Sequence, residues 1–168
     1  MTERKSKRVV TGHNEDGKSI VAYTGPISFQ MWVTDNSPAD NKHKNDAAKR
    51  KVRLEPPSNG SKLAFFQVLP EDPSRSVEDV EKETAAGFEA IDASHCRPDT
   101  TRDPRMHKTK TVDYIILLEG EVTLLLDEDE IDLKPYDVVI QRGTNHAWIN
   151  RGTSTALLAA ILIDAEPL

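Results

Sequence analysis

Two side chains with acid–base or metal-binding chemistry, His107 and Asp113, stand six residues apart in a stretch that is typical of a β-strand. In an extended chain they point to one side, together with Thr109 and Thr111 between them. Ile115 continues that side, which predicts that it faces an apolar interior. A buried carboxylate is costly without a partner. The pattern therefore predicts either a metal ion or a hydrogen-bond network at this position.

His146, Trp148 and Asn150 share one face of a later predicted strand. In a small barrel, two such strands can face each other across the interior. Two imidazoles and a carboxylate, from His107, His146 and Asp113, would form a three-ligand site for Zn, Fe, Mn or Ni with positions left for substrate or water. The alternative is a pair of histidines at the barrel rim, satisfied by hydrogen bonds alone. For Trp148, a core aromatic is favoured over the floor of a substrate pocket.

These residues need a set of strands to position them. Alternating apolar residues and turn signals indicate many short strands at even spacing, which favours an all-β fold, a small antiparallel barrel or sandwich. The predicted strands are residues 8–11, 19–24, 29–34, 62–69, 112–118, 121–126, 130–133, 137–141, 145–150 and 155–163.

One helix is predicted over about Val77 to Ala86, from a narrow apolar stripe at spacings of three and four residues. Ser76 is the expected N-cap, and Gly87 is expected to end the helix.

Two stretches resemble the motifs of a known family. Met106 to Gly120 resembles the first cupin motif, with His107 at its first histidine, Asp113 at its carboxylate and Gly120 at its glycine. Tyr136 to Asn150 resembles the second motif, with Gly143, His146 and Asn150 at its spaced glycine, histidine and asparagine. The resemblance implies a cupin-like barrel or jelly roll whose core motifs occupy residues 106–164. Residues 1–105 are then an N-terminal extension, with strands and the helix packing on the barrel of a single domain.

Three positions depart from the motifs. Thr109 stands where a second metal-binding histidine is usual, and a neutral hydroxyl is a poor ligand, so a divalent metal is implied but not assured. Asp113 is shorter than the usual glutamate. Tyr136 replaces a turn glycine, and Pro135-Tyr136 is expected to form a type I turn that needs no positive φ.

Composition excludes several classes of protein. The 168 residues carry a net charge of −6, and residues 56–168 hold 11 basic and 21 acidic side chains, which argues against nucleic-acid binding. No apolar run reaches the ~18 residues of a membrane helix. The basic segment 42–53 is expected to be a solvated loop. The single cysteine, Cys96, and the absence of a signal sequence favour a cytoplasmic location.

The resemblance implies a small-molecule enzyme with its substrate inside the barrel, where Thr109, Trp148, Asn150 and Gln141 would line the pocket. The incomplete ligand set favours lyase chemistry, dehydration or decarboxylation of a small organic acid or polyketide-like substrate. In that scheme His107 or His146 is the acid–base group, and Asp113 orients it or binds metal. The alternatives are a metal-dependent dioxygenase or isomerase and a non-catalytic ligand-binding or sensor protein. A homodimer is also expected.

Overall fold

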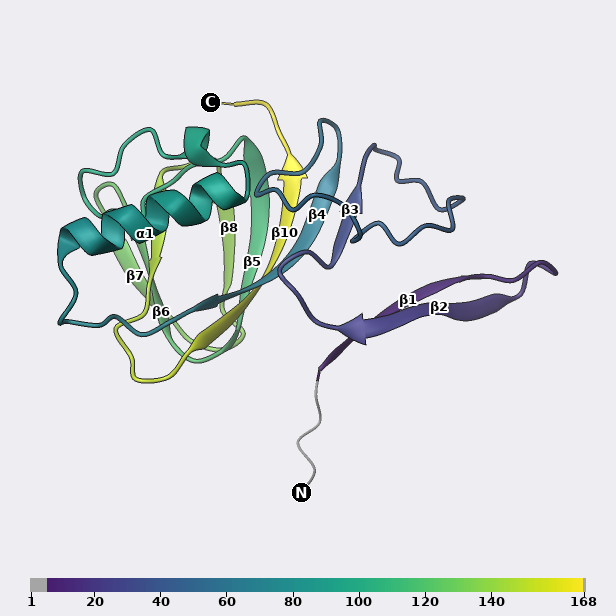
Figure 1. The fold of residues 1–168 in the computed structure, drawn as a ribbon, viewed down its shortest axis with the longest axis horizontal. Coiled ribbons are helices and arrows are strands. Elements are labelled where there is room, and N and C mark those ends of the chain that lie inside the picture. The colour runs from purple at the N-terminus through teal and green to yellow at the C-terminus, as the bar shows by residue number, and fades with distance from the viewer. Residues whose placement is uncertain (1–5, 168) are drawn as a thin grey trace, which may run out of the picture.

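The computed structural model describes residues 6–167, which form an antiparallel β-structure with one α-helix (Figure 1). The all-β fold class predicted from the sequence is confirmed. The elements in chain order are β1 (Lys7–His13), β2 (Ser19–Pro26), β3 (Trp32–Thr34), β4 (Ser61–Val68), α1 (Val77–Ala90), the 3-10 turn η1 (Ser94–Cys96), β5 (Thr111–Glu119), β6 (Val122–Leu126), β7 (Glu130–Leu133), β8 (Val138–Arg142), β9 (His146–Ile149) and β10 (Ala156–Asp164).

Two sheets build the barrel, one five-stranded in the order β3-β4-β10-β5-β8 and one three-stranded in the order β7-β6-β9. The larger sheet takes β3 and β4 from residues before 106. The barrel is therefore not confined to residues 106–164, because β4 supplies a complete edge of hydrogen bonds to β10. The apolar side chains of the two sheets meet in one core, which includes Ala64, Ile115, Leu117, Leu124, Trp148, Leu158, Ala160 and Leu162.

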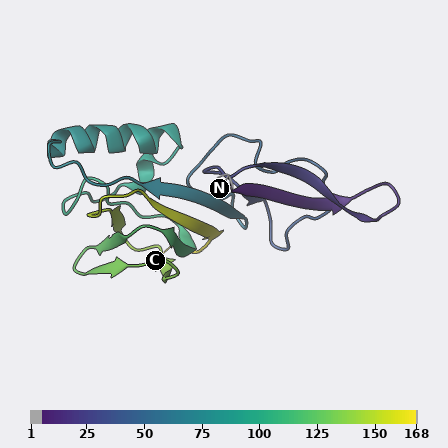
Figure 2. The same ribbon diagram turned by 90° about the horizontal axis from the view of Figure 1, so that it is seen from below.

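The first two strands stand apart from the barrel. They pair only with each other as a two-stranded sheet, which projects to one side of the molecule (Figures 1 and 2). Val9, Ile20 and Val21 of this hairpin are exposed. This part of the N-terminal extension does not pack on the barrel as expected, whereas β3 and β4 are integral to it. The homodimer that the sequence predicts stays a prediction.

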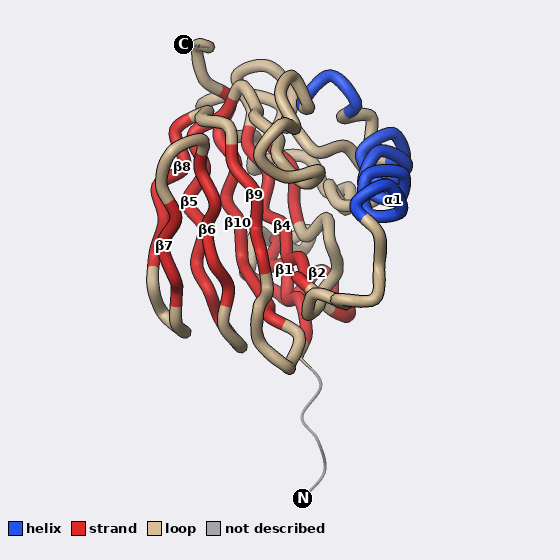
Figure 3. The backbone as a smooth tube through the Cα atoms, turned by 90° about the vertical axis from the view of Figure 1, so that its left-hand side faces the viewer, coloured by secondary structure: helices blue, strands red, loops and turns tan. Residues whose placement is uncertain are grey.

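The helix lies on the outside of the barrel, beside the end of the sheets that holds η1 (Figure 3). Ser76 caps it as predicted, since its hydroxyl accepts a hydrogen bond from the Asp79 N–H at 3.1 Å. The predicted end at Gly87 is wrong, because α1 runs on to Ala90. Glycine costs a helix only about 1 kcal/mol, and the extra turn brings Phe88 against the ring of His107, 4.9 Å between centroids.

Two turn positions differ in how well the sequence predicts them. Gly120 has φ +78°, and a Cβ there would lie 2.8 Å from the backbone of Ala156, so the turn between β5 and β6 requires glycine. Tyr136 also has a positive φ, +78°, while Pro135 precedes it and the Asp137 N–H bonds to the Lys134 carbonyl. This is the geometry of a type II turn, so the predicted type I turn is wrong.

No helix among residues 6–167 has the length and apolar character of a membrane span.

Candidate active site

The two motif histidines are direct neighbours in the structure. His107 precedes β5 and His146 opens β9, and they form an isolated antiparallel bridge in which each N–H donates to the other's carbonyl at 2.8 Å. Side chains of such a pair lie on the same face. Their imidazole centroids are accordingly 4.2 Å apart, and Trp148, two residues along β9, lies edge-on to His146 at 5.6 Å.

Both imidazoles are held by backbone carbonyls. The Nδ1 of His107 lies 3.0 Å from the carbonyl oxygen of Arg105, and the Nδ1 of His146 lies 2.9 Å from that of Thr144. Because a carbonyl only accepts, each Nδ1 must carry the proton. Burial lowers the pKa of both histidines, that of His146 to about 3, with the neighbouring His107 adding to the effect. Both rings are thus neutral, and both Nε2 atoms are proton acceptors.

Asp113 faces the same interior from the middle of the larger sheet. It is 4% exposed, and its Oδ1 has no hydrogen-bond partner among the residues that the structure describes. Burial, the largest cause, raises its pKa to about 6, while a hydrogen bond from Thr111 acts in the opposite direction. The expected role of Asp113 as the group that orients a histidine is not observed, since the carbonyls of Arg105 and Thr144 do this instead.

His107, Asp113 and His146, hereafter the interior site, line a cavity of about 190 Å³ inside the barrel. The remaining walls are almost entirely apolar. Phe29 and Leu54 come from the segment before β4, Phe88 and Ile91 from α1 and the residue after it, and Phe66, Ile115, Trp148, Ala160 and Leu162 from the sheets. The cavity is smaller than the ~300 Å³ at the lower end of drug-sized pockets, which fits a small ligand.

Two of the four predicted pocket residues line this cavity. Thr109 is buried, and its hydroxyl is 2.6 Å from that of Thr111; Trp148 lies in the wall and is also part of the core. Asn150 and Gln141 do not line it. The Asn150 amide donates to the carbonyls of Val68 and Ser154 and accepts from a backbone N–H in the turn after β9, so it is structural. Gln141 is buried beside Asp113, but its amide donates to the Thr144 carbonyl.

A further polar residue in the cavity wall, Lys62 on β4, was not predicted as a site residue. A signal for it exists in the sequence, because Lys62, Ala64 and Phe66 alternate with residues of the opposite face. That parity places a lysine on an otherwise apolar inner face. In the structure Lys62 is 2% exposed.

The spacing of the donor atoms tests whether the interior site fits a metal ion. Two ligands on one ion at about 2.0–2.2 Å cannot be more than about 4.4 Å apart. Within residues 6–167, the group of three His, Cys, Asp or Glu donors that lie within 4.8 Å of one another is Glu55, His95 and Cys96. As placed here, His107, Asp113 and His146 do not fit a common ion. Their assignment as metal ligands stays a prediction, and the chemistry proposed below uses no metal.

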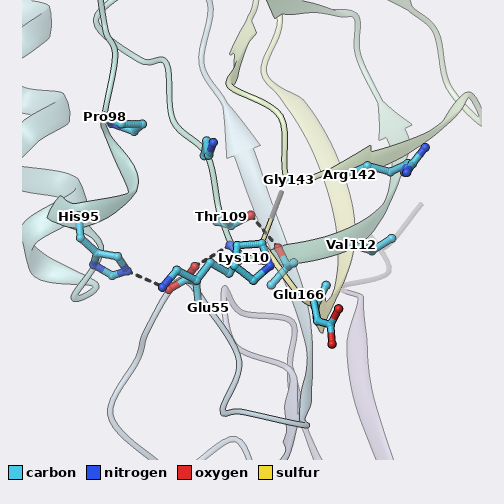
Figure 4. Close-up of a pocket in the computed structure, with 13 residues that line it drawn as sticks. Glu55, His95, Pro98, Thr109, Lys110, Val112, Arg142, Gly143 and Glu166 are labelled. Carbon is cyan, nitrogen blue, oxygen red and sulfur yellow. Dashed lines mark hydrogen bonds and ion pairs between the residues drawn. The ribbon is translucent and has the colours of Figure 1, made fainter.

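The group that meets this spacing, hereafter the outer cluster, consists of Glu55, His95 and Cys96 near the surface. His95 Nε2 lies 2.9 Å from a Glu55 oxygen and 3.5 Å from the Cys96 sulfur. Figure 4 shows His95 and Glu55 pointing toward each other at a hollow of about 250 Å³. Because one nitrogen faces both partners, the three cannot relay a proton from thiol to carboxylate. Burial, followed by the charge of Glu55, raises the pKa of the Cys96 thiol to about 12.

Comparison with known proteins identifies similar fungal chains. A phomopsin biosynthesis cluster protein C' of Diaporthe leptostromiformis is 43% identical over 65 residues, 38% of this chain and 34% of that protein. An oryzines biosynthesis cluster protein J of Aspergillus oryzae is 43% identical over 68 residues, 39% of this chain and 38% of that protein. This chain therefore spans little more than a third of the length of these relatives.

A cupin-domain-containing oxidoreductase of Neurospora crassa is 25% identical over 179 residues, 97% of this chain and 77% of that protein. No family model matches. Among solved structures, a Cupin 2 conserved barrel domain protein from Salinispora arenicola aligns over 62% of this chain and 64% of that chain, at 14% identity and a TM-score of 0.39. At that score the structural likeness adds nothing to the similarity in sequence and topology.

Proposed function

We propose that the barrel cavity of this chain, which is similar over 97% of its length to a cupin-domain-containing oxidoreductase, is the active site of a small-molecule lyase, a dehydratase acting on a β-hydroxy carbonyl compound. One observation carries the proposal. A buried carboxylate, Asp113, has an oxygen without a hydrogen-bond partner in the wall of an apolar cavity. A carboxyl group raised toward neutral pKa by such burial is well matched to taking up and releasing a proton near pH 7.

In the proposed reaction Asp113 is the acid–base group, in place of the histidines favoured by the sequence. Its carboxylate takes the proton from the carbon next to the substrate carbonyl, and the electron pair of that C–H bond forms the new C=C bond. The β C–O bond breaks, and the carboxyl group returns its proton to the departing hydroxide, so that water leaves. Atoms and charge balance without a co-reactant.

The histidines position the substrate in this scheme. Their Nε2 atoms accept hydrogen bonds, and the carbonyls of Arg105 and Thr144 fix the orientation of both rings. The β-hydroxyl of a substrate can therefore donate to an Nε2 while its carbon chain lies against Phe66 and Trp148. Such fixed acceptors select one orientation of the leaving group.

The names of the relatives support a biosynthetic substrate and also a second candidate function. Three are named for biosynthesis clusters, which fits a small organic molecule as the substrate. Three are named cupin-domain-containing oxidoreductases, one of them matching nearly the whole chain. Oxidoreductase chemistry is accordingly the alternative to dehydration.

The test uses 4-hydroxy-4-phenylbutan-2-one, a β-hydroxy ketone whose dehydration gives a conjugated enone that absorbs in the near ultraviolet. We expect the protein to form the enone in the presence of a chelator. Asp113→Asn should lower the rate by about 10²–10⁴-fold. The matched control, Asp129→Asn, removes an exposed carboxylate outside the cavity and should leave the rate unchanged.

Two results would contradict the dehydratase. Turnover that requires added Fe(II) and consumes oxygen would establish the oxidoreductase instead. Stoichiometric binding without turnover across a series of β-hydroxy ketones and acids would indicate a ligand-binding module.

A further inference from the structure

Lys62 occupies a defined place in the inner face of the larger sheet. In the strand register it pairs with Val33 on one side and with Leu162 on the other, and Leu162 in turn pairs with Asp113. Residues directly opposite each other point to the same face. Lys62 on β4 and Asp113 on β5 thus lie in one row across the sheet, with only strand β10 between them and about 10 Å between their Cα atoms.

The ammonium group of Lys62 forms no ion pair with any residue from 6 to 167. Its Nζ donates to the carbonyl of Arg53 and lies 4.3 Å from the centroid of the Phe29 ring. No carboxylate of residues 6–167 pairs with it, and burial alone lowers its pKa to about 8. Of three N–H donors, one is used within the chain. A cation buried in this way is costly unless another charge compensates it.

Packing alone does not require the ammonium. The apolar stem of Lys62 fills the wall between Phe29 and Ala64, and a methionine would fill the same space. The carbonyl that Lys62 contacts belongs to Arg53, an exposed loop residue. The side chain of Lys62 lies between this cavity and a surface hollow that Arg53 and Glu55 also line, so an anion in the cavity can reach its ammonium group.

We propose that Lys62 binds the carboxylate of a small organic acid whose apolar body lies against Phe66, Phe88 and Trp148. This inference rests on the proposed use of the barrel cavity as the ligand site, and it names the class of ligand. The remaining N–H donors of Lys62 form charge-assisted hydrogen bonds to the carboxylate. The reacting carbons of the ligand then lie over Leu162, between Lys62 on one side and the interior site on the other.

Binding of two matched probes tests the inference independently of turnover. Benzoate carries the carboxylate, and benzyl alcohol has the same ring without the charge. Ligand-observed NMR at pH 7 should show benzoate binding to the wild-type protein about tenfold more tightly than benzyl alcohol. Lys62→Met should remove that preference and leave benzyl alcohol binding within about twofold. Lys134→Met, at an exposed turn lysine, should behave as the wild type.

A second measurement on the wild-type protein guards against misfolding of the variant. With ¹⁵N-labelled lysine, the Lys62 Nζ resonance should shift on addition of benzoate and not on addition of benzyl alcohol. Equal affinities of the two probes for the wild type, or a preference for benzoate that survives in folded Lys62→Met, would overturn the inference. If benzoate binds as expected while neither β-hydroxy ketones nor β-hydroxy acids are turned over, the carboxylate site stands and the dehydratase fails.

Discussion

The outer cluster and the interior site contain similar side chains, but only those of the outer cluster bond to one another. In the outer cluster a carboxylate, an imidazole and a thiol lie close together near the surface and bond to one another. In the interior site the two imidazoles are neighbours, but their donor atoms and those of Asp113 are not all within 4.8 Å of one another, and all three side chains line a cavity. Closeness of polar groups is thus a poor guide to reactivity. Polar groups that hydrogen-bond to one another have no free donor or acceptor for a ligand, whereas buried polar groups without partners can still bind one.

The largest expected effect is on the pH dependence of stability. The pKa of Asp113 is raised from 3.8 to about 6, so the stability it contributes is present below pH 4 and is lost as pH rises through 6. The shift corresponds to about 3 kcal/mol. Asp113→Asn should therefore be more stable than the wild type at pH 7, by up to about 3 kcal/mol, and equal to it near pH 4. Urea unfolding at a series of pH values measures this.

His146 should act with the opposite sign. Its pKa is lowered from 6.5 to about 3, so its contribution to stability is present above pH 6.5 and is lost progressively as pH falls. His146→Gln should reduce the loss of stability on acidification from pH 6.5 to 4. A difference between variant and wild type that does not change with pH, for either residue, would show that the interior site is hydrated and would remove the contrast with the outer cluster.

The next effect concerns metal binding. Thr109 is buried in the cavity wall, so Thr109→His would add a third imidazole near His107 and His146. In a Cys96→Ser background, where the outer cluster has lost its thiol, Co²⁺ should bind at least about tenfold more tightly to the protein with Thr109→His than to the protein without it. Absorption of the bound Co²⁺ measures the affinity. Equal affinity with the fold intact would mean that residue 109 does not present its side chain to the interior site.

Parity and motif spacing in the sequence were enough to predict the barrel, the burial of Asp113 and Thr109, and the meeting of the two histidines. These depend on strand periodicity, which is a local property. The features that the sequence could not predict depend on contacts with backbone groups that are far away in the chain. The amide of Asn150 is used by the carbonyl of Val68, 82 positions away in the chain, and not by a ligand.

Likewise, the carbonyls of Arg105 and Thr144 orient the histidines. Because every residue has a backbone carbonyl, residue types do not indicate which carbonyl will accept a given hydrogen bond. The contribution of β4 to the barrel, and with it Lys62, follows from pairing with β10 across nearly a hundred residues. Gly87 illustrates the same limit at short range, since contact of Phe88 with His107 outweighs the local preference to end the helix.

The smallest effects should come from the outer cluster. The side chain of His95 is largely exposed, and a pair of this kind contributes below about 1 kcal/mol. Glu55→Gln should therefore change the free energy of unfolding by less than that. It should also leave Cys96 unreactive, because burial is the largest cause of its raised thiol pKa and the charge of Glu55 is secondary. Reaction with a disulfide reagent at pH 8 should be slow in both proteins and become fast only on unfolding. Rapid reaction of the native wild-type thiol would show that the outer cluster holds a thiolate, and would make it, and not the interior site, the more reactive of the two regions.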